Sequence, residues 1–346
     1  MAEKNVANVE EEKITLIDVL KLVSPGTVLR TAIDDILRAE MGALIVVYSD
    51  KVNEIMEGGF SIDTLLSSQK IVELAKMDGA IIVSEDLKKI MNANVMLVPN
   101  ISIKTEETGT RHKAAERTAK QAGTLVITVS ERRKKITVYN GHLRYILQDT
   151  DEVLSRAVET LQILEKQREI FNELLSNLNL LEISGLVVVG DVCSVLQRIE
   201  IIMRTAKTME KYLIELGREG GVIKMRLREL LKNIDREKSL ILQDYETKED
   251  TLDEFGFDDL LESENIANLL FSSSSDTKIA PKGYRILSKM NLGKKETNRL
   301  VEHFKNLSDI LEASPKDLVE VLGEDTETFN KEVTSLKEQI MMAKKI

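Results

Sequence analysis

The sequence predicts a mixed α/β domain at the amino end, then an all-α spine and a small all-α domain at the carboxyl end. Short β-branched runs alternate with helical stretches up to about residue 148. Apolar residues then recur at helical spacing to about residue 245, and two helix–turn–helix patterns follow residue 278. We therefore expect domains at residues 1–148, 149–277 and 278–346.

The first domain contains apolar runs of four to six residues, which is the length and composition of buried strands. They cover residues 43–48, 80–83, 95–98, 125–129 and 136–139, with helical stretches at 64–75 and 113–121. Asn140-Gly141 predicts a β-hairpin to residues 142–147, because both residues tolerate a positive φ. This pattern predicts a mixed sheet with flanking helices.

The middle of the chain is expected to be helical. Leucines from Leu154 to Leu178 predict one helix, residues 191–216 a second, and a third after Gly220-Gly221 that ends near residue 244. Residues 246–264 contain nine acidic residues and one Lys, and serines fill positions 272–275. Such a composition is typical of a flexible linker or of a solvated face.

Charge and cysteine content limit the classes of function. A net charge of −10 argues against a protein that binds nucleic acid over its whole surface, so any DNA contact is local. Cys193 is the single cysteine, which excludes an intrachain disulfide and a metal cluster held by cysteines. The acidic first residues lack a signal-peptide pattern, and the apolar runs are too short to cross a bilayer. We therefore expect a cytoplasmic protein without a membrane partner.

The first candidate site segment is Asp78-Gly79-Ala80, directly before the apolar run at 81–83. The glycine would let a backbone N–H approach a ligand closely, and Asp78 would supply an acceptor or a carboxylate for a metal. The alternative is an ordinary Asp-Gly turn.

The second segment, residues 107–117, lies where a helix is expected to begin. Backbone N–H groups at a helix N-terminus bind anions, and Thr108, Thr110, Arg111 and Lys113 would complete a triphosphate cradle. His112 is suited to donate to a phosphate or to ligate a divalent metal. The alternative is a solvated basic turn, although basic residues oppose the helix dipole there unless an anion is bound.

The third segment is the basic turn 130–135 between two expected strands. Beside a phosphate cradle, Ser130 and Arg133 would hold a second set of phosphate oxygens. The alternative is a basic turn that is only solvated.

Together these segments resemble the DNA-integrity scanning diadenylate cyclase family. Asp78-Gly79-Ala80 matches that family's DGA motif, and Thr110-Arg111-His112-Lys113 falls at its Arg-His-Arg motif. Segments 58–63, 74–77, 93–95, 97–99 and 139–141 are similar as well. The resemblance implies that two ATP molecules condense to cyclic di-AMP with Mg or Mn, in a homo-oligomer that is octameric in known members.

The resemblance also implies residue roles. Asp78, Arg111 and His112 would be catalytic, with Asp78 and His112 facing the metal. The nucleotide contacts would be Gly79, Ala80, Leu97, Thr108, Thr110, Lys113, Ser130 and Arg133. Lys113 stands in place of the motif's last arginine and loses its planar fork, and Ala114 stands where the family usually has threonine. These departures support a second hypothesis, a catalytically weak scaffold protein that binds DNA junctions.

The tail resembles tandem helix-hairpin-helix motifs, with turns at 291–293 and 322–325. Such motifs bind the DNA backbone without reading sequence, and family members use this tail to sense branched DNA. Residues 278–305 carry eight Lys or Arg against two Glu, whereas residues 309–338 carry three basic against nine acidic residues. The expected contacts to branched or double-stranded DNA are Lys282, Lys289, Lys294, Lys295 and Arg299. The alternative is a tail that only packs or oligomerises.

Overall fold

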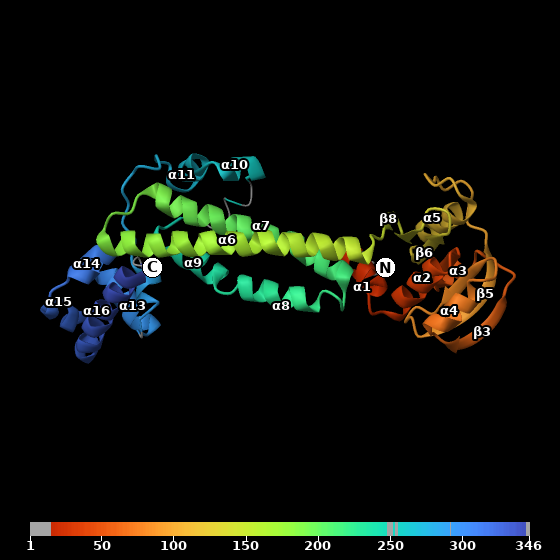
Figure 1. Ribbon diagram of the computed structural model, residues 1–346, viewed down its shortest axis with the longest axis horizontal. Helices are drawn as coiled ribbons and strands as arrows, with labels where there is room; N and C mark the ends of the chain where they lie inside the picture. The colour runs from red at the N-terminus through yellow and green to blue at the C-terminus, as the bar shows by residue number, and fades with distance from the viewer. Residues whose placement is uncertain (1–14, 248–251, 253–254, 291, 344–346) are drawn as a thin grey trace, which may run out of the picture. The chain divides into compact units, whose positions relative to one another are not determined.

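The computed structural model describes residues 15–247, 252, 255–290 and 292–343. The chain divides into two compact units, one made of Met1–Ala157 with Glu210–Ile223 and the other of Val158–Met209 with Lys224–Ile346. Figure 1 labels the elements along the chain.

A mixed β-sheet forms the centre of the first unit. Its strands follow the order β2-β5-β4-β1-β6-β7-β8, and β3 also pairs with β5. Strands β1 and β4 run parallel, and the other pairs are antiparallel. The strands are β1 (Ala43–Val47), β2 (Met56–Glu57), β3 (Phe60–Leu65), β4 (Ala80–Val83), β5 (Lys89–Leu97), β6 (Leu125–Ser130), β7 (Lys135–Asn140) and β8 (Leu143–Ile146).

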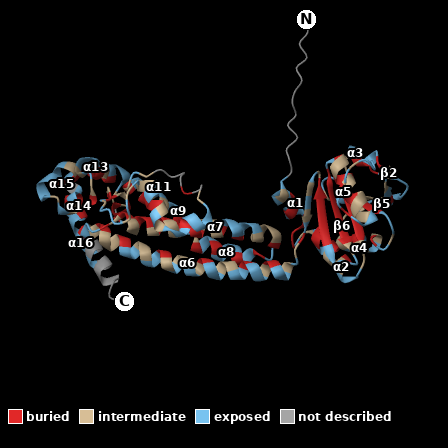
Figure 2. Ribbon diagram, turned by 90° about the horizontal axis from the view of Figure 1, so that it is seen from above, coloured by how far each residue is buried: buried red, intermediate tan, exposed pale blue. Residues whose placement is uncertain are grey.

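Helices cover both faces of this sheet, as the burial colours show in Figure 2. Alternate side chains of β1 belong to different cores: Ile45 packs toward α1 (Leu16–Val23), α2 (Val28–Arg38) and α4 (Ser68–Leu74), and Val46 toward α3 (Asp50–Asn53) and α5 (Thr110–Ala122). A strand buried on both faces has few polar positions. This burial explains why β1, β4 and β6 are nearly continuous apolar runs.

Most of the expected strands are confirmed, and so is the hairpin, where Asn140 pairs with Leu143. The helix expected over 64–75 is wrong at its start, because Thr64 and Leu65 belong to β3 and pair with β5. Strands β2 and β3 were not expected at all. They pair only with β5 and are largely exposed, so they lack the apolar run that identifies a buried strand.

Long helices follow the sheet, and both units include residues from α6 (Thr150–Ser184) and α7 (Val189–Leu216). In the second unit, α6 presents Leu164, Phe171 and Leu178 to the core at intervals of seven residues. The expected third helix is two helices, α8 (Gly221–Leu230) and α9 (Ile234–Asp244). The break falls at Asn233, which adopts a positive φ of 66°.

The acidic segment forms two short helices, α10 (Phe257–Leu261) and α11 (Ser263–Phe271). They bury Leu260, Ile266 and Ala267 and leave the acidic side chains of residues 258–264 exposed. Within residues 257–264 the flexible linker is therefore wrong, and the alternative of a solvated face is confirmed. A few apolar residues at helical spacing outweigh the acidic composition, because their burial stabilises the helix. Residues 248–251 and 253–254 lie outside the described residues.

The tail consists of short helices around their own core. They are α12 (Tyr284–Leu287), α13 (Lys294–Phe304), α14 (Leu307–Glu312), α15 (Pro315–Leu322), the 3₁₀ turn η2 (Gly323–Asp325) and α16 (Thr326–Ala343). The second expected hairpin is confirmed as α15–η2–α16. The helix expected between residue 278 and the first turn is only the four residues of α12, and Asn291 of that turn lies outside the described residues.

A fully buried arginine joins the tail to the helices before it. Arg285 of α12 forms an ion pair with Glu182 of α6 at 2.5 Å, and both side chains are fully buried. The second terminal nitrogen of Arg285 donates to Asn179 Oδ1 at 2.6 Å, and Tyr245 donates to Glu182 at 2.9 Å. Buried charges are tolerated when they are paired and hydrogen-bonded in this way.

A second buried carboxylate fixes the backbone of the same helix. Asp244 at the end of α9 accepts hydrogen bonds from the backbone N–H groups of Gly283, Tyr284 and Arg285, at 2.9, 2.6 and 3.0 Å. These N–H groups begin α12 and have no partner within the helix. The helix start is therefore capped by a residue from another element.

Arg285→Met should destabilise the second unit by about 3–5 kcal/mol, because it leaves the Glu182 carboxylate buried without its cation. Urea unfolding of the full chain, followed by helical circular dichroism, measures this loss. The matched control is Lys316→Met, which removes an exposed lysine of α15 and should change stability by less than about 0.5 kcal/mol. Equal midpoints for the two variants would contradict a stabilising role for the buried ion pair.

Candidate functional site

One edge of the sheet gathers the expected site segments. Parallel pairing of β1 with β4 places their amino ends together, and the antiparallel partner β6 ends at the same edge, where Val129 lies opposite Ala43. Neighbouring strands are about 4.8 Å apart, so the start of β4 and the end of β6 are roughly 10 Å apart. The Asp78-Gly79 turn and the basic turn after Ser130 therefore occupy the same edge.

An open pocket of about 370 Å³ lies between the start of α5 and the β6–β7 turn. Its lining residues are Glu107, Thr108, Gly109, Thr110, Arg111, His112, Ser130, Glu131, Arg132 and Arg133. The structure thus brings together six of the residues expected from the sequence, from two separate segments. The volume is within the range of small-ligand sites.

The pocket is suited to an anion. Helix α5 begins after Gly109 without a side-chain cap and without an acidic residue in its first turn. The first N–H groups of a helix lack intrahelical partners and carry a partial positive charge. Arg111, Arg132 and Arg133 add guanidinium groups around the same space, which favour phosphate oxygens.

The Asp78-Gly79 turn is fixed by crowding against β5. Gly79 has a φ of 90°, and a Cβ there would lie 2.8 Å from the carbonyl carbon of Asn94 and 2.9 Å from the carbonyl oxygen of Val95. Only glycine fits this position. Asp78 is exposed and does not line the pocket, although it lies at the same edge.

Three other expected contacts lie apart from this pocket. Ala80 is fully buried in the core, and Leu97 at the end of β5 is partly buried against that core. Lys113 is partly buried on α5 and does not line the pocket. Contacts of these three residues with a nucleotide stay predictions.

Gly42, just before β1, makes room for Arg111. A Cβ at Gly42 would lie 1.8 Å from one terminal nitrogen of the Arg111 guanidinium. The missing side chain therefore lets the arginine lie against the edge of the sheet. The sequence reasoning missed Gly42, although a glycine directly before the first strand was a legible signal.

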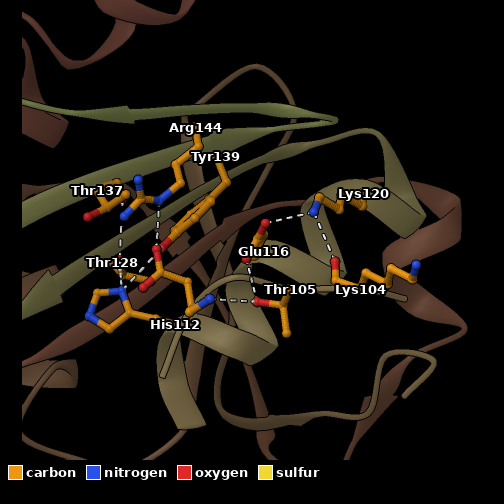
Figure 3. Close-up of polar contacts among 10 residues, drawn as sticks. Lys104, Thr105, His112, Glu116, Lys120, Thr128, Thr137, Tyr139 and Arg144 are labelled. Atoms are coloured by element: carbon orange, nitrogen blue, oxygen red, sulfur yellow. Dashed lines mark hydrogen bonds and ion pairs between the residues drawn. The ribbon is translucent and has the colours of Figure 1, made fainter. Parts of the chain in front are cut away.

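His112 is held by a chain of polar groups from three elements (Figure 3). Its Nδ1 lies 2.9 Å from Thr128 Oγ1 and 3.2 Å from the Tyr139 hydroxyl. The Tyr139 hydroxyl donates to Glu107 at 2.9 Å, and Arg144 Nε donates to the same carboxylate oxygen at 2.7 Å. One ring nitrogen of His112 is thus engaged, and Nε2 is left for a ligand.

The surroundings set the charge of both titratable groups. Burial opposes ionisation of Glu107, but hydrogen bonds from Arg144 and Tyr139 outweigh it and hold the pKa of this carboxyl below its usual value. Burial lowers the pKa of His112; the Glu107 carboxylate opposes this shift, and Arg133 and Arg111 add to it. At neutral pH the site therefore pairs an ionised Glu107 with a neutral His112.

The sequence reasoning assigned no role to Glu107, Thr128, Tyr139 or Arg144. Thr128 and Tyr139 are buried polar groups within apolar strands, and that interruption was the available signal. Their contact with α5 depends on strand register and could not be read from spacing alone.

Of the two predicted metal ligands, Asp78 offers the carboxylate oxygens that Mg and Mn prefer, whereas the imidazole of His112 is a ligand more typical of softer metals such as Zn or Fe. Mg and Mn take one or two protein ligands and complete their shell with water and substrate phosphates. Within the described ranges, no group of three or more His, Cys, Asp or Glu could hold a metal by itself. An ion here would therefore depend on phosphates in the adjacent pocket.

The five expected DNA contacts divide into two groups. Lys294, Lys295 and Arg299 are exposed on α13, and the described residues provide no hydrogen-bond or ion-pair partner for them. Lys282 instead pairs with Glu246, and Lys289 donates to Asn179 at 2.7 Å. Helix α13 therefore presents the free positive charge of the expected set.

Comparisons with known proteins agree with this geometry. The family model described as "DisA bacterial checkpoint controller nucleotide-binding" matches residues 30–143, and the model of that controller's linker region matches residues 147–278. Curated relatives named "DNA integrity scanning protein DisA" include one from Clostridium kluyveri, 43% identical over 97% of this chain and 99% of the relative. Another, from Acetivibrio thermocellus, is 45% identical over 89% of each chain. No described helix is long and apolar enough to cross a membrane.

Gly42→Ala should weaken binding of ATP about tenfold, because the new methyl group displaces the Arg111 guanidinium and removes a charge-assisted hydrogen bond. Stability should change little, since the displaced atoms end a flexible side chain. Calorimetric titration with ATP measures the affinity. Gly221→Ala, which meets no atom within 4 Å, is the matched control. Unchanged affinity in Gly42→Ala would show that Arg111 does not bind phosphate from this position.

Proposed function

Because the chain belongs to the DNA integrity scanning protein family, DisA, we propose that it is a diadenylate cyclase that condenses two ATP into cyclic di-AMP and two pyrophosphates. The observation that carries the proposal is that the Asp78-Gly79 turn lies at the same edge of the sheet as the pocket at the start of α5, which is suited to phosphates. A carboxylate beside an anion site is the arrangement that a nucleotidyl transfer needs.

The reaction forms two phosphodiester bonds. Each 3′-hydroxyl attacks the α-phosphate of the other ATP, the bond to the β-phosphate breaks, and pyrophosphate leaves with its electrons. One pocket of this size holds one ATP, so we propose that two subunits face each other, within a homo-oligomer that is octameric as the family resemblance implies. Catalysis is then mainly positioning and neutralisation of charge.

The residues of the pocket divide this work. Thr110, Arg111 and Arg133, with the free N–H groups of α5, bind the triphosphate and the departing pyrophosphate. Asp78 lies near the attacking hydroxyl, accepts a hydrogen bond from it and so orients it. A bound Mg or Mn would neutralise phosphate charge and would be held by Asp78, His112 and phosphate oxygens.

The second hypothesis, a catalytically weak scaffold protein, depended on Lys113, Ala114 and the net charge of −10. Lys113 does not line the pocket, whereas the three guanidinium groups of Arg111, Arg132 and Arg133 do. The loss of one planar fork at position 113 therefore leaves the anion site with its main charges. This distribution favours the cyclase over the scaffold.

For the tail, we propose that DNA binds along α13 and regulates the cyclase. Support comes from the exposed Lys294, Lys295 and Arg299 and from the hairpin α15–η2–α16 that follows in the same core. Contacts of this kind reach phosphates and not base edges, so affinity would not depend on base sequence. A cytoplasmic location would give the protein access to both ATP and DNA.

Asp78→Asn should abolish synthesis of cyclic di-AMP and leave the sheet intact, because the side chain is exposed and keeps its size. The expected loss is at least a hundredfold, on the order of one general-base contribution. Chromatography of product from ATP with Mg or Mn measures it. Asp50→Asn, an equal change at an exposed position in α3, serves as the control. Near wild-type turnover in Asp78→Asn would remove that residue from the mechanism.

Replacement of both Lys294 and Lys295 by Glu should weaken binding to every duplex alike and lower the salt dependence of binding, because fewer counterions are released. The control is the double change Lys316→Glu and Lys331→Glu, which alters charge equally at exposed positions in the acidic half of the tail. A salt titration with linear and branched DNA compares them. Equal affinities would place the DNA contact outside α13.

A further inference from the structure

We propose that Glu107 is a positioning residue that fixes, through Tyr139, the tautomer of His112 with hydrogen on Nδ1 and a lone pair on Nε2 facing the pocket. Both Glu107 and Tyr139 lie in segments singled out from the sequence, but neither was given a role there. The proposal rests on the proposed function for its consequence, but its structural statement can be tested without ATP.

The hydrogen-bond directions in the chain follow from counting hydrogens. Glu107 is paired with Arg144 Nε at 2.7 Å, so its carboxylate only accepts. Tyr139 has one hydroxyl hydrogen, which it donates to Glu107 at 2.9 Å. At its contact of 3.2 Å with His112 Nδ1, the Tyr139 oxygen can therefore only accept. The hydrogen of that contact belongs to Nδ1.

Thr128 is compatible with the same assignment. Its hydroxyl donates toward the backbone carbonyl of Thr137 at 3.4 Å, and its oxygen lies 2.9 Å from Nδ1. Both oxygens near Nδ1 are then acceptors. A single N–H hydrogen shared between two acceptors satisfies the three groups without leaving a buried donor unpaired.

The Glu107 carboxylate is held from two sides. Arg144 and Tyr139 bind its head, and the backbone N–H of Glu107 donates to Thr105 Oγ1 at 3.1 Å. Thr105 in turn donates to Glu116 of α5, which pairs with Lys120 at 2.7 Å (Figure 3). The loop before α5 is thereby fixed to the helix whose first turn carries His112. Because the carboxylate is fixed in this way, it determines the direction in which the Tyr139 hydroxyl points its hydrogen.

As a consequence, His112 and the arginines of the pocket have different roles. A neutral imidazole with its lone pair on Nε2 accepts a hydrogen bond from a substrate hydroxyl or binds a cation, and it does not donate to a phosphate oxygen. Phosphate charge is met by Arg111, Arg132 and Arg133. His112 therefore acts beside the phosphate sites as an acceptor.

Nitrogen-15 spectra of protein labelled at histidine test the tautomer directly. The chain has three histidines, and His112→Gln assigns the signal. In the ligand-free full chain we expect the nitrogen-15 chemical shifts of a neutral imidazole that carries its hydrogen on Nδ1. Glu107→Leu should invert this Nδ1 pattern, because the tyrosine hydroxyl loses its acceptor and becomes free to donate to Nδ1. A wild-type signal with hydrogen on Nε2 would overturn the proposal.

Kinetics test the consequence for the reaction. Glu107→Leu and Tyr139→Phe should each lower kcat by about tenfold to a hundredfold, the usual effect of groups that orient a site residue. KM for ATP should change much less, because the arginines that bind phosphate stay in place. The double variant should be no slower than the slower single variant, since both changes break one chain.

Lys120→Met is the matched control, because it removes a partly buried charge from the same network at a point beyond Glu116. It should leave the His112 signal and kcat near wild type. Additive kcat losses, or an unchanged kcat in Tyr139→Phe, would overturn the proposal. A wild-type protein that makes no cyclic di-AMP but shows the Nδ1 pattern would sink the proposed function and leave the tautomer assignment standing.

Discussion

The parallel pairing of β1 with β4 is the constraint on which the first unit depends. Because these neighbours run in one direction, the glycines that precede them, Gly42 and Gly79, lie at the same edge. The antiparallel pairing of β1 with β6 brings the end of β6 to this edge. The start of α5 lies there too, because it lines one pocket together with the residues that follow β6. An all-antiparallel sheet with the same strands would send the Asp78 turn to the opposite edge from Arg111. The site is thus a consequence of one choice of strand direction.

The polar network of the site also belongs to the core of the sheet. Tyr139 packs among the apolar residues beneath α5, and Thr128 lies on the same face of β6 as Val126. Burial of these hydroxyls is tolerated because each has a hydrogen-bond partner. The residues that hold His112 therefore contribute to packing and to chemistry together, and the rigidity of the sheet is transmitted to the imidazole.

Much of this architecture could be predicted from the sequence, and the failures share a cause. Apolar runs located β1, β4, β6 and β7, because strands buried on both faces must be apolar. The Arg-His segment and the basic turn located residues that line the pocket, whereas the role of the DGA segment stays a prediction. The roles of Glu107 and Tyr139 could not be predicted from the sequence, because they arise from a contact between a loop residue and a strand residue that lie 32 positions apart. Strands β2 and β3, and the helices of the acidic segment, depend likewise on tertiary partners that outweigh local composition.

Because of the contacts of Arg285 and the cap by Asp244, the tail depends on the helices that precede it. Helix α12 has four residues, too few to persist alone in water, and its first N–H groups are capped by Asp244 of another element. A fragment that begins at residue 278 would lose this cap, and the remainder would lose the arginine that pairs with Glu182. Grafting the tail onto an unrelated protein would therefore require transfer of α9 and the end of α6 with it. The smallest part of the chain that keeps these contacts is therefore larger than the helices of the tail core.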